Sequence, residues 1–204
     1  MKIIKPKISN LEEKIFEIDT TITGIFKEQN IDIYEKDLKF DECIFDKVDI
    51  LNSDISKSEF IDAIFKNSDI SNTNMEESMF RRVIFEDSKL IGVDFSTSNL
   101  NNISFINCKL DYSNFSNAKF KNVEFINCSL VNTSFNSSSI LDTIFEESDL
   151  TNSEFLDTSL KGIDFTTSII DNISIMNKDL KGLIVNSEQA LYLVGYLGII
   201  IKDR

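Results

Sequence analysis

The sequence contains no histidine, and this absence restricts its chemistry more than any other feature of its composition. Histidine is the usual general base, the commonest metal ligand and a member of the Ser/His and Cys/His catalytic pairs. The adjacent carboxylates Glu86-Asp87 and Glu146-Glu147 sit in no pattern that predicts a cleft able to shift their pKa values. We therefore expect a protein that is not an enzyme and that uses no metal or cofactor.

Cysteine, basic residues and long apolar runs are also scarce. The three cysteines, Cys43, Cys108 and Cys128, are too few and odd in number for a disulfide framework. The longest apolar stretch, 190–201, is too short to span a bilayer, and residues 1–14 lack the apolar segment of a signal peptide. The 21 Lys and Arg against 34 Asp and Glu give a net charge of −13, which argues against direct binding of nucleic acid or anionic membranes. The sequence predicts a cytoplasmic protein with a basic protein partner.

The chain has a hydrophobic period of five in place of a helical or strand period. From Phe40 to Val185 every fifth residue is Phe, Leu, Ile, Met or Val, over thirty consecutive positions that hold fifteen of the seventeen phenylalanines. Two residues before each of these positions the residue is mostly Ser, Thr, Ala or Cys, and polar residues fill the rest. Such a pattern predicts large and small side chains alternating in a narrow interior, with the polar residues in water.

This pattern resembles the pentapeptide-repeat family, as in Ser68-Asp69-Ile70-Ser71-Asn72 and Ala118-Lys119-Phe120-Lys121-Asn122. The resemblance implies an all-β fold, a right-handed quadrilateral β-helix in which four pentapeptides make one square coil. Residues twenty apart should then stack on one wall, and the sequence agrees with this. One column is aliphatic: Ile50, Ile70, Leu90, Leu110, Leu130, Leu150 and Ile170. The preceding column, named the Phe column here, is Phe45, Phe65, Phe85, Phe105, Phe125, Phe145 and Phe165.

A coil cannot bury its own residues, so a solenoid needs both ends covered. We assign 1–38 to an N-terminal capping segment, 39–185 to the β-helix and 186–204 to a C-terminal helix and short strand. Ser9 with Glu12 predicts a capping box for a short helix over 11–16, and 31–34 is strand-like. At the other end Ser187 is the expected N-cap, Gly198 the C′ residue and 199–201 a strand.

The residues Gly182-Leu183-Ile184-Val185-Asn186, Gln189-Ala190 and Leu197-Gly198-Ile199 resemble the C-terminal end of the Qnr-type and MfpA-type fluoroquinolone-resistance proteins. This resemblance implies a homodimer formed through the C-terminus. It also implies a partner, bacterial DNA gyrase or topoisomerase IV, bound by mimicry of the DNA duplex. Qnr-type proteins carry loops that interrupt the coils and that matter for drug protection, whereas the five-residue phase here is uninterrupted and closer to the MfpA pattern. This difference argues more against drug protection than against binding to the enzyme. The candidate dimer contacts are Leu191, Val194, Leu197 and Ile199.

Acidic residues dominate the outward positions of three of the four expected walls, while Arg81, Arg82, Lys121 and Lys161 mark a mixed one. The stretch 122–160, named the acidic section here, has seven acids and no Lys or Arg. It corresponds to two coils of about 9 Å, along which B-DNA carries about five or six charges. An ordinary solvated acidic surface explains these residues equally well. The candidate partner-binding residues are Glu124, Asp142, Glu146, Glu147, Asp149, Glu154 and Asp157.

Other features leave alternatives open. An interaction or scaffold protein with an unknown target is nearly as well supported as a DNA mimic. The outward residues Ile44, Ile64, Ile84 and Ile144 are either covered by 1–38, which we favour, or form a contact patch. Cys108 and Cys128 are expected to be reduced core residues. Amide stacking between coils is the expected role of the column Asn52, Asn72, Asn132, Asn152 and Asn172.

Overall fold

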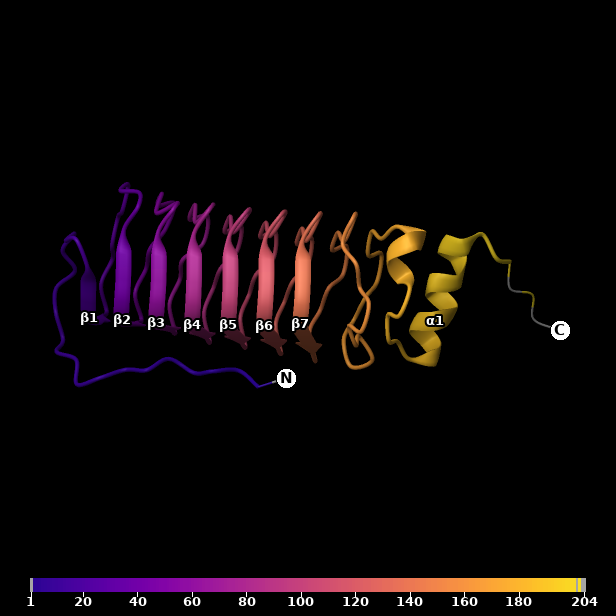
Figure 1. The fold of residues 1–204 in the computed structure, drawn as a ribbon, viewed down its shortest axis with the longest axis horizontal. Coiled ribbons are helices and arrows are strands. Elements are labelled where there is room, and N and C mark those ends of the chain that lie inside the picture. Colours follow the sequence, from indigo (N-terminus) through magenta and orange to yellow (C-terminus); the bar gives the residue numbers. More distant parts are fainter. Residues whose placement is uncertain (1, 201, 203–204) are drawn as a thin grey trace.

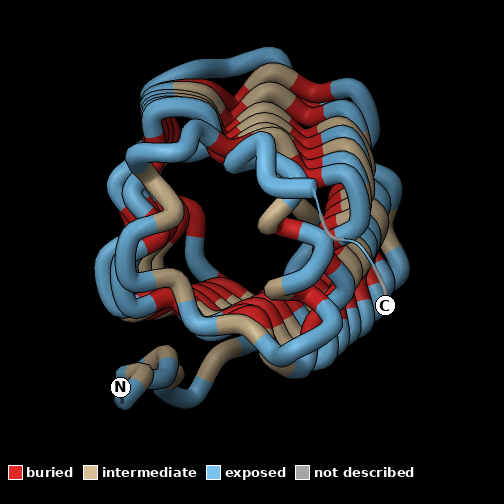
Figure 2. Tube along the Cα trace, turned by 90° about the vertical axis from the view of Figure 1, so that its right-hand side faces the viewer, coloured by how far each residue is buried: buried red, intermediate tan, exposed pale blue. Residues whose placement is uncertain are grey.

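The computed structural model describes residues 2–200 and 202, and its main element is one sheet of seven parallel strands in sequence order. From β2 onwards each strand pairs with the next in a register of twenty residues, such as Phe45 with Phe65. Figure 1 shows the strands side by side along a rod, and Figure 2, along its axis, shows the four-sided coil. The right-handed quadrilateral β-helix is therefore confirmed. The strands are β1 (Ile22–Lys27), β2 (Lys39–Asp46), β3 (Glu59–Lys66), β4 (Met79–Glu86), β5 (Asn99–Ile106), β6 (Lys119–Ile126) and β7 (Ser139–Glu146).

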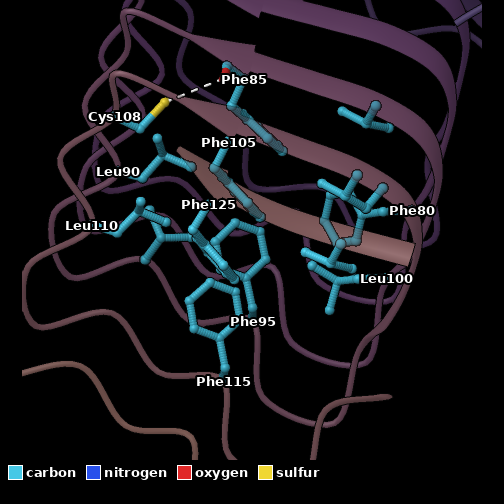
Figure 3. Packing of buried hydrophobic residues seen from close by; sticks show 14 of the residues in the cluster. Phe80, Phe85, Leu90, Phe95, Leu100, Phe105, Cys108, Leu110, Phe115 and Phe125 are labelled. Carbon is cyan, nitrogen blue, oxygen red and sulfur yellow. Dashed lines mark hydrogen bonds between the residues drawn. The ribbon is translucent and has the colours of Figure 1, made fainter. Parts of the chain in front are cut away.

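The Phe column is buried along its whole length and stacks as the superperiod predicts. Ring centroids of neighbours from Phe45 to Phe145 lie 4.5–5.0 Å apart, with ring planes within 14° of each other. Figure 3 shows the rings of Phe85, Phe105 and Phe125 one above another. Phe165 departs from this, since its ring meets that of Phe145 edge-on at 63°. Stacking between coils thus defines the interior up to the last turn.

The small inward residues do more than leave space for the rings. Their hydroxyl groups donate to the carbonyl of a core residue 23 positions earlier, as Ser98 does to Met75 (3.0 Å) and Thr158 to Phe135 (2.6 Å). The Cys108 thiol donates to the Phe85 carbonyl in the same way (3.3 Å; Figure 3). All three cysteines are buried and free, as expected. Ser, Thr and Cys therefore satisfy polar backbone atoms that the narrow core would otherwise leave unpaired.

The residue two places after a core position nearly always has a left-handed backbone. Among the described residues, twenty-six other than glycine have φ between 49° and 62°, and sixteen of these are Asn or Asp. These two residue types tolerate that conformation best after glycine. The column Asn52, Asn72, Asn132, Asn152 and Asn172 lies at this position, with φ of 52–60°. Backbone geometry accounts for these asparagines, and no hydrogen bond joins their amides in the described part of the chain.

The N-terminal segment differs from the expected helix. Residues 11–16 are extended, because the open edge of β1 needs a partner: Lys14 N–H donates to Ile25 O (2.8 Å) and Ile25 N–H to Glu12 O (2.9 Å). Phe16 packs edge-on against Phe26, which continues the Phe column 5.1 Å from Phe45. The first coil therefore begins at β1, earlier than residue 39. The strand expected at 31–34 is absent, although Ile31 and Ile33 are buried in this coil.

The C-terminal cap consists of α1 (Ser187–Val194) followed by the 3₁₀ turn η2 (Gly195–Leu197). Asn186, not Ser187, is the N-cap, and it forms a capping box with Gln189. Gly198 ends the helical segment with φ of 69°, as expected of a C′ glycine. Residues 199 and 200 form no strand, and residue 201 lies outside the described residues.

Candidate partner-binding surfaces

The seven predicted acidic residues lie around the rod and not on one face. Glu124, Glu146 and Glu147 extend from the wall of the Phe column to its corner, and Asp149 follows on the next wall. Glu154 and Asp157 lie on the third wall and Asp142 on the fourth. Glu124 and Asp149 are half-buried, and the other five are exposed.

Hydrogen bonds divide these carboxylates into two groups. Glu124 accepts from the Ser104 hydroxyl (2.6 Å), and Asp149 accepts from the amide (2.9 Å) and hydroxyl (2.6 Å) of Thr151. Glu154 accepts from the Asn136 side-chain amide (2.6 Å). Within 2–200, the carboxylates of Asp142, Glu146 and Glu147 accept no hydrogen bond, so they are the ones most available to a partner.

The acidic section is partly neutralised by a residue outside it. Lys178 lies in the 3₁₀ turn η1 (Asn177–Leu180), where the chain leaves the five-residue phase, and its ammonium group donates to Asp157 (2.6 Å). Lys178 therefore occupies an exposed position and not the inward one that the phase assigns to it. The hydrogen bond that Lys178 donates to Asp157, and the negative charge of that carboxylate, raise the pKa of Lys178. The spacing of 21 residues fits adjacent coils, but the five-residue phase places Lys178 inward, so the sequence alone did not predict this contact.

A shallow polar groove of about 520 Å³ runs along the corner that carries Glu147 and Asp149. Its lining includes Lys109, Asn107 and Asn127, so it is not uniformly negative. Asn127 donates to Asn107 (2.9 Å), and Asn107 donates to Asp87 (2.9 Å). Among the described residues no group of three metal-ligating side chains is placed to hold an ion, and none of their helices is long and apolar enough to cross a membrane.

The C-terminal end presents several exposed apolar residues. Leu191, Leu197 and Ile199 are 60%, 52% and 54% exposed, and Val194 is half-buried. Val194 and Leu197 line an apolar hollow of about 200 Å³ between the helix and the last coil. The cap itself rests on buried Leu193 and on Gln189, and not on the face shared by Leu191, Val194 and Leu197.

Side-chain donors of this cap satisfy carbonyls at the open end of the solenoid. The Gln189 amide donates to the carbonyls of Phe165 (2.8 Å) and Ser168 (2.7 Å), and the Tyr196 hydroxyl donates to that of Ile173 (2.5 Å). Burial, together with the hydroxyl of Tyr192, raises the pKa of Tyr196 to about 12. The end is thus closed against strand addition, while the outer apolar residues of the helix stay available for contact.

The repeat, its four walls and the capped ends define a pentapeptide-repeat solenoid, and the comparison of sequences agrees. The model of the family described as pentapeptide repeat region matches residues 38–115 and 118–192. A second family model, described as pentapeptide repeats (8 copies), matches residues 98–136. The chain therefore belongs to the pentapeptide-repeat family. A comparison with curated protein sequences finds no significant match.

Solved structures similar to this chain come from the same family. A trypsin-treated variant of QnrB1, a plasmid-mediated fluoroquinolone resistance protein, is 21% identical over 90% of this chain and 99% of its own, with a TM-score of 0.40. HetL from the cyanobacterium Nostoc sp. strain PCC 7120, described as involved in heterocyst differentiation regulation, is 9% identical over 80% of this chain and 86% of its own, with a TM-score of 0.46.

Proposed function

We propose that this chain is a binding protein that presents a partial mimic of duplex DNA to the basic DNA-binding surface of a type II topoisomerase, DNA gyrase or topoisomerase IV. The acidic section carries this proposal, since it concentrates seven acids over two coils without a Lys or Arg of its own. The resemblance of the C-terminal residues to the Qnr-type and MfpA-type proteins supports the choice of partner.

The charge density of the acidic section is close to that of DNA. Two coils span about 9 Å, and a duplex of that length carries about five or six phosphates distributed around its cylinder. The section has seven carboxylates, and the contact with Lys178 offsets the one on Asp157. Their distribution over four walls suits mimicry of a cylinder, whose phosphates also face all directions.

A C-terminal homodimer would double the acidic length. Leu191, Val194, Leu197 and Ile199 supply apolar surface at one end of the rod, beyond the residues that cap the core. A two-fold axis through this end gives an isologous interface, which closes and stops filament growth. The two rods would then lie end to end, with their acidic sections toward the middle of the dimer.

A second candidate, an interaction or scaffold protein with a target unrelated to DNA, is favoured by the positive charges beside the acids. Lys109 lies in the same groove as Glu147 and Asp149, and Lys121 and Lys161 flank the acidic section on the mixed wall. A mixed surface of this kind suits an ordinary protein interface. Capture of partners from a bacterial lysate distinguishes the two, because topoisomerase subunits are either the main captured proteins or absent.

The deciding experiment measures supercoiling by gyrase, and decatenation by topoisomerase IV, with added protein and with or without a fluoroquinolone. We expect inhibition or drug protection at micromolar protein. The double substitution E146Q/E147Q, which removes two unpaired exposed carboxylates, should weaken the effect. The matched control E76Q/E77Q changes a Glu-Glu pair at the same repeat position outside the acidic section. Absence of any effect on both enzymes, or equal losses in the two variants, would refute the proposal.

A further inference from the structure

Residues 2–9, named the strap here, lie outside the coil and run back along the rod from β2 towards β5 (Figure 1). The strap belongs to no strand, and its described hydrogen bonds reach side chains of the wall and not its backbone. Ile4 N–H donates to Asn102 Oδ1 (3.0 Å), Lys7 N–H to Asp62 Oδ1 (2.8 Å) and Ser9 N–H to Glu42 Oε2 (3.0 Å).

The three acceptors share one place in the repeat. Asp62 lies twenty residues after Glu42, and Asn102 lies forty after Asp62, so all three share a single corner of the solenoid, each with a left-handed backbone that holds its side chain outward. Neighbouring coils are about 4.8 Å apart, so this corner offers a ladder of side-chain oxygens along the axis. The side chains at this corner, named the acceptor row here, are Glu42, Asp62, Arg82, Asn102, Asn122 and Asp142, and all of them except Arg82 offer a side-chain oxygen as an acceptor.

Contacts within the wall hold members of the acceptor row in place independently of the strap. Arg82 forms a two-point ion pair with the buried Asp62, which fixes that carboxylate against the wall. Asn102 donates its amide to Asn101 (2.6 Å), so its Oδ1 atom points to the strap. Because the row accepts backbone N–H groups, these hydrogen bonds select an extended backbone and leave the choice of sequence to other contacts.

Charge determines which extended peptides suit the row. The strap contains Lys2, Lys5 and Lys7 and no acid, whereas the row contains three carboxylates and one arginine. The row also continues past the contact with Ile4, through half-buried Asn122 to exposed Asp142. Next to Asp142, Leu141 and Ile144 are 58% and 36% exposed, while Ile64 and Ile84, on coils within the span of the strap, are half-buried.

We propose that the acceptor row is a docking ledge for an extended segment of a partner protein rich in lysine and aliphatic residues. The strap is its occupant within the chain, and the partner segment binds by displacing residues 2–9. The ledge is a different surface from the exposed apolar end at α1, and its use does not depend on a topoisomerase partner. Asn122 and Asp142 lie in both the ledge and the acidic section, and Asp142 is the one acid that the two surfaces share.

The test uses the full chain and a fluorescein-labelled peptide with the sequence of residues 2–10, followed by fluorescence anisotropy. K7P removes the N–H that donates to Asp62 and leaves the row intact, whereas K5P makes the same exchange at an amide with no described contact to the wall. We expect the peptide to bind K7P about tenfold more tightly than the unchanged protein, and K5P no more tightly than the unchanged protein. Equal binding to K7P and K5P overturns the proposal.

Two further measurements locate the bound peptide and test whether the strap opens. In the K7P chain, N102A should weaken peptide binding, while N152A, at the same repeat position on another corner, should not. A peptide with glutamate in place of each lysine should not bind. In the unchanged protein, the amides of Ile4, Lys7 and Ser9 should exchange at least about a hundredfold faster than those of β4. Equal effects of N102A and N152A, binding of the acidic peptide, or strap amides as slow as the strand refute the ledge.

Discussion

Replacing Phe105 with alanine removes a ring from the middle of the Phe column. The side chain is fully buried, stacked at 5.0 Å on Phe85 and 4.8 Å on Phe125, with edge contacts to Phe95 and Phe115 at 6.2 and 6.1 Å. Truncation of a buried phenylalanine costs about 3–5 kcal/mol, and an aromatic pair contributes about 0.5–1.5 kcal/mol beyond its buried area. With two stacked pairs lost, we expect a decrease of about 5 kcal/mol in the free energy of unfolding.

The same substitution at Phe165 provides the comparison. This ring is equally buried but meets Phe145 edge-on at 5.4 Å and has no stacked partner, so we expect a loss of about 3 kcal/mol. M79A, at a residue 47% exposed, should change stability by less than about 0.5 kcal/mol. Urea unfolding followed by circular dichroism measures all three. If Phe105 costs no more than Phe165, stacking between coils is not what makes the column stable.

Three further predictions concern other parts of the chain. T97N should raise the free energy of unfolding by about 0.5–1 kcal/mol, because Thr97 has φ of 57° and asparagine tolerates that backbone better; a lower urea midpoint contradicts this. Burial alone would raise the pKa of Asp62, but hydrogen bonds from Arg82 and the Lys7 amide lower it overall. Asp62 should therefore stabilise the fold above about pH 4 and lose this effect as pH falls through its lowered pKa. In D62N, the free energy of unfolding measured between about pH 2 and 6 should lack this pH dependence. L191E/L197E should convert the proposed dimer to a monomer in sedimentation without loss of helix, whereas a monomeric unchanged protein refutes the dimer.

The columns of the core could be predicted from the sequence because large apolar residues recur at the same place in successive coils, although their type changes at some steps, as from Phe80 to Leu100. The series from Phe45 to Phe145 keeps one residue type at one spacing, and the structure stacks it accordingly. The structure of the N-terminal capping residues could not be predicted in this way. Ser9 and Glu12 carry a local helix signal, yet the unpaired edge of β1 at Ile25 attracts residues 12–14 into a parallel bridge. Pairing with a strand that lies later in the chain therefore outweighs the local helix propensity.

The sequence predicted which residues lie on the surface of the rod, but not which of their side chains contact one another. The acids of the acidic section can be read from the sequence. Their hydrogen-bond and ion-pair partners depend on which coils are adjacent and on where the five-residue phase ends. Lys178 occupies an inward position in the five-residue phase, and only the turn η1 places it beside Asp157. Residues 1–38 were expected to cover the isoleucine ladder, but nothing in the sequence predicted the hydrogen bonds of the strap to Asp62 and Asn102, because the bonded residues are 55 and 98 apart with no periodic signal between them.

The solenoid separates the residues that hold the fold from those that can meet a partner. Stability arises inside, from stacked rings and from inward hydroxyl groups that donate to core carbonyls, while Asp142, Glu146 and Glu147 make no described hydrogen bond through their carboxylates. Exposed side chains away from such contacts change stability by at most about 0.5 kcal/mol when replaced. Their neutral variants should therefore unfold as the unchanged protein does. Any loss of topoisomerase inhibition in E146Q/E147Q can then be assigned to binding, because the rod that presents the charges is the same.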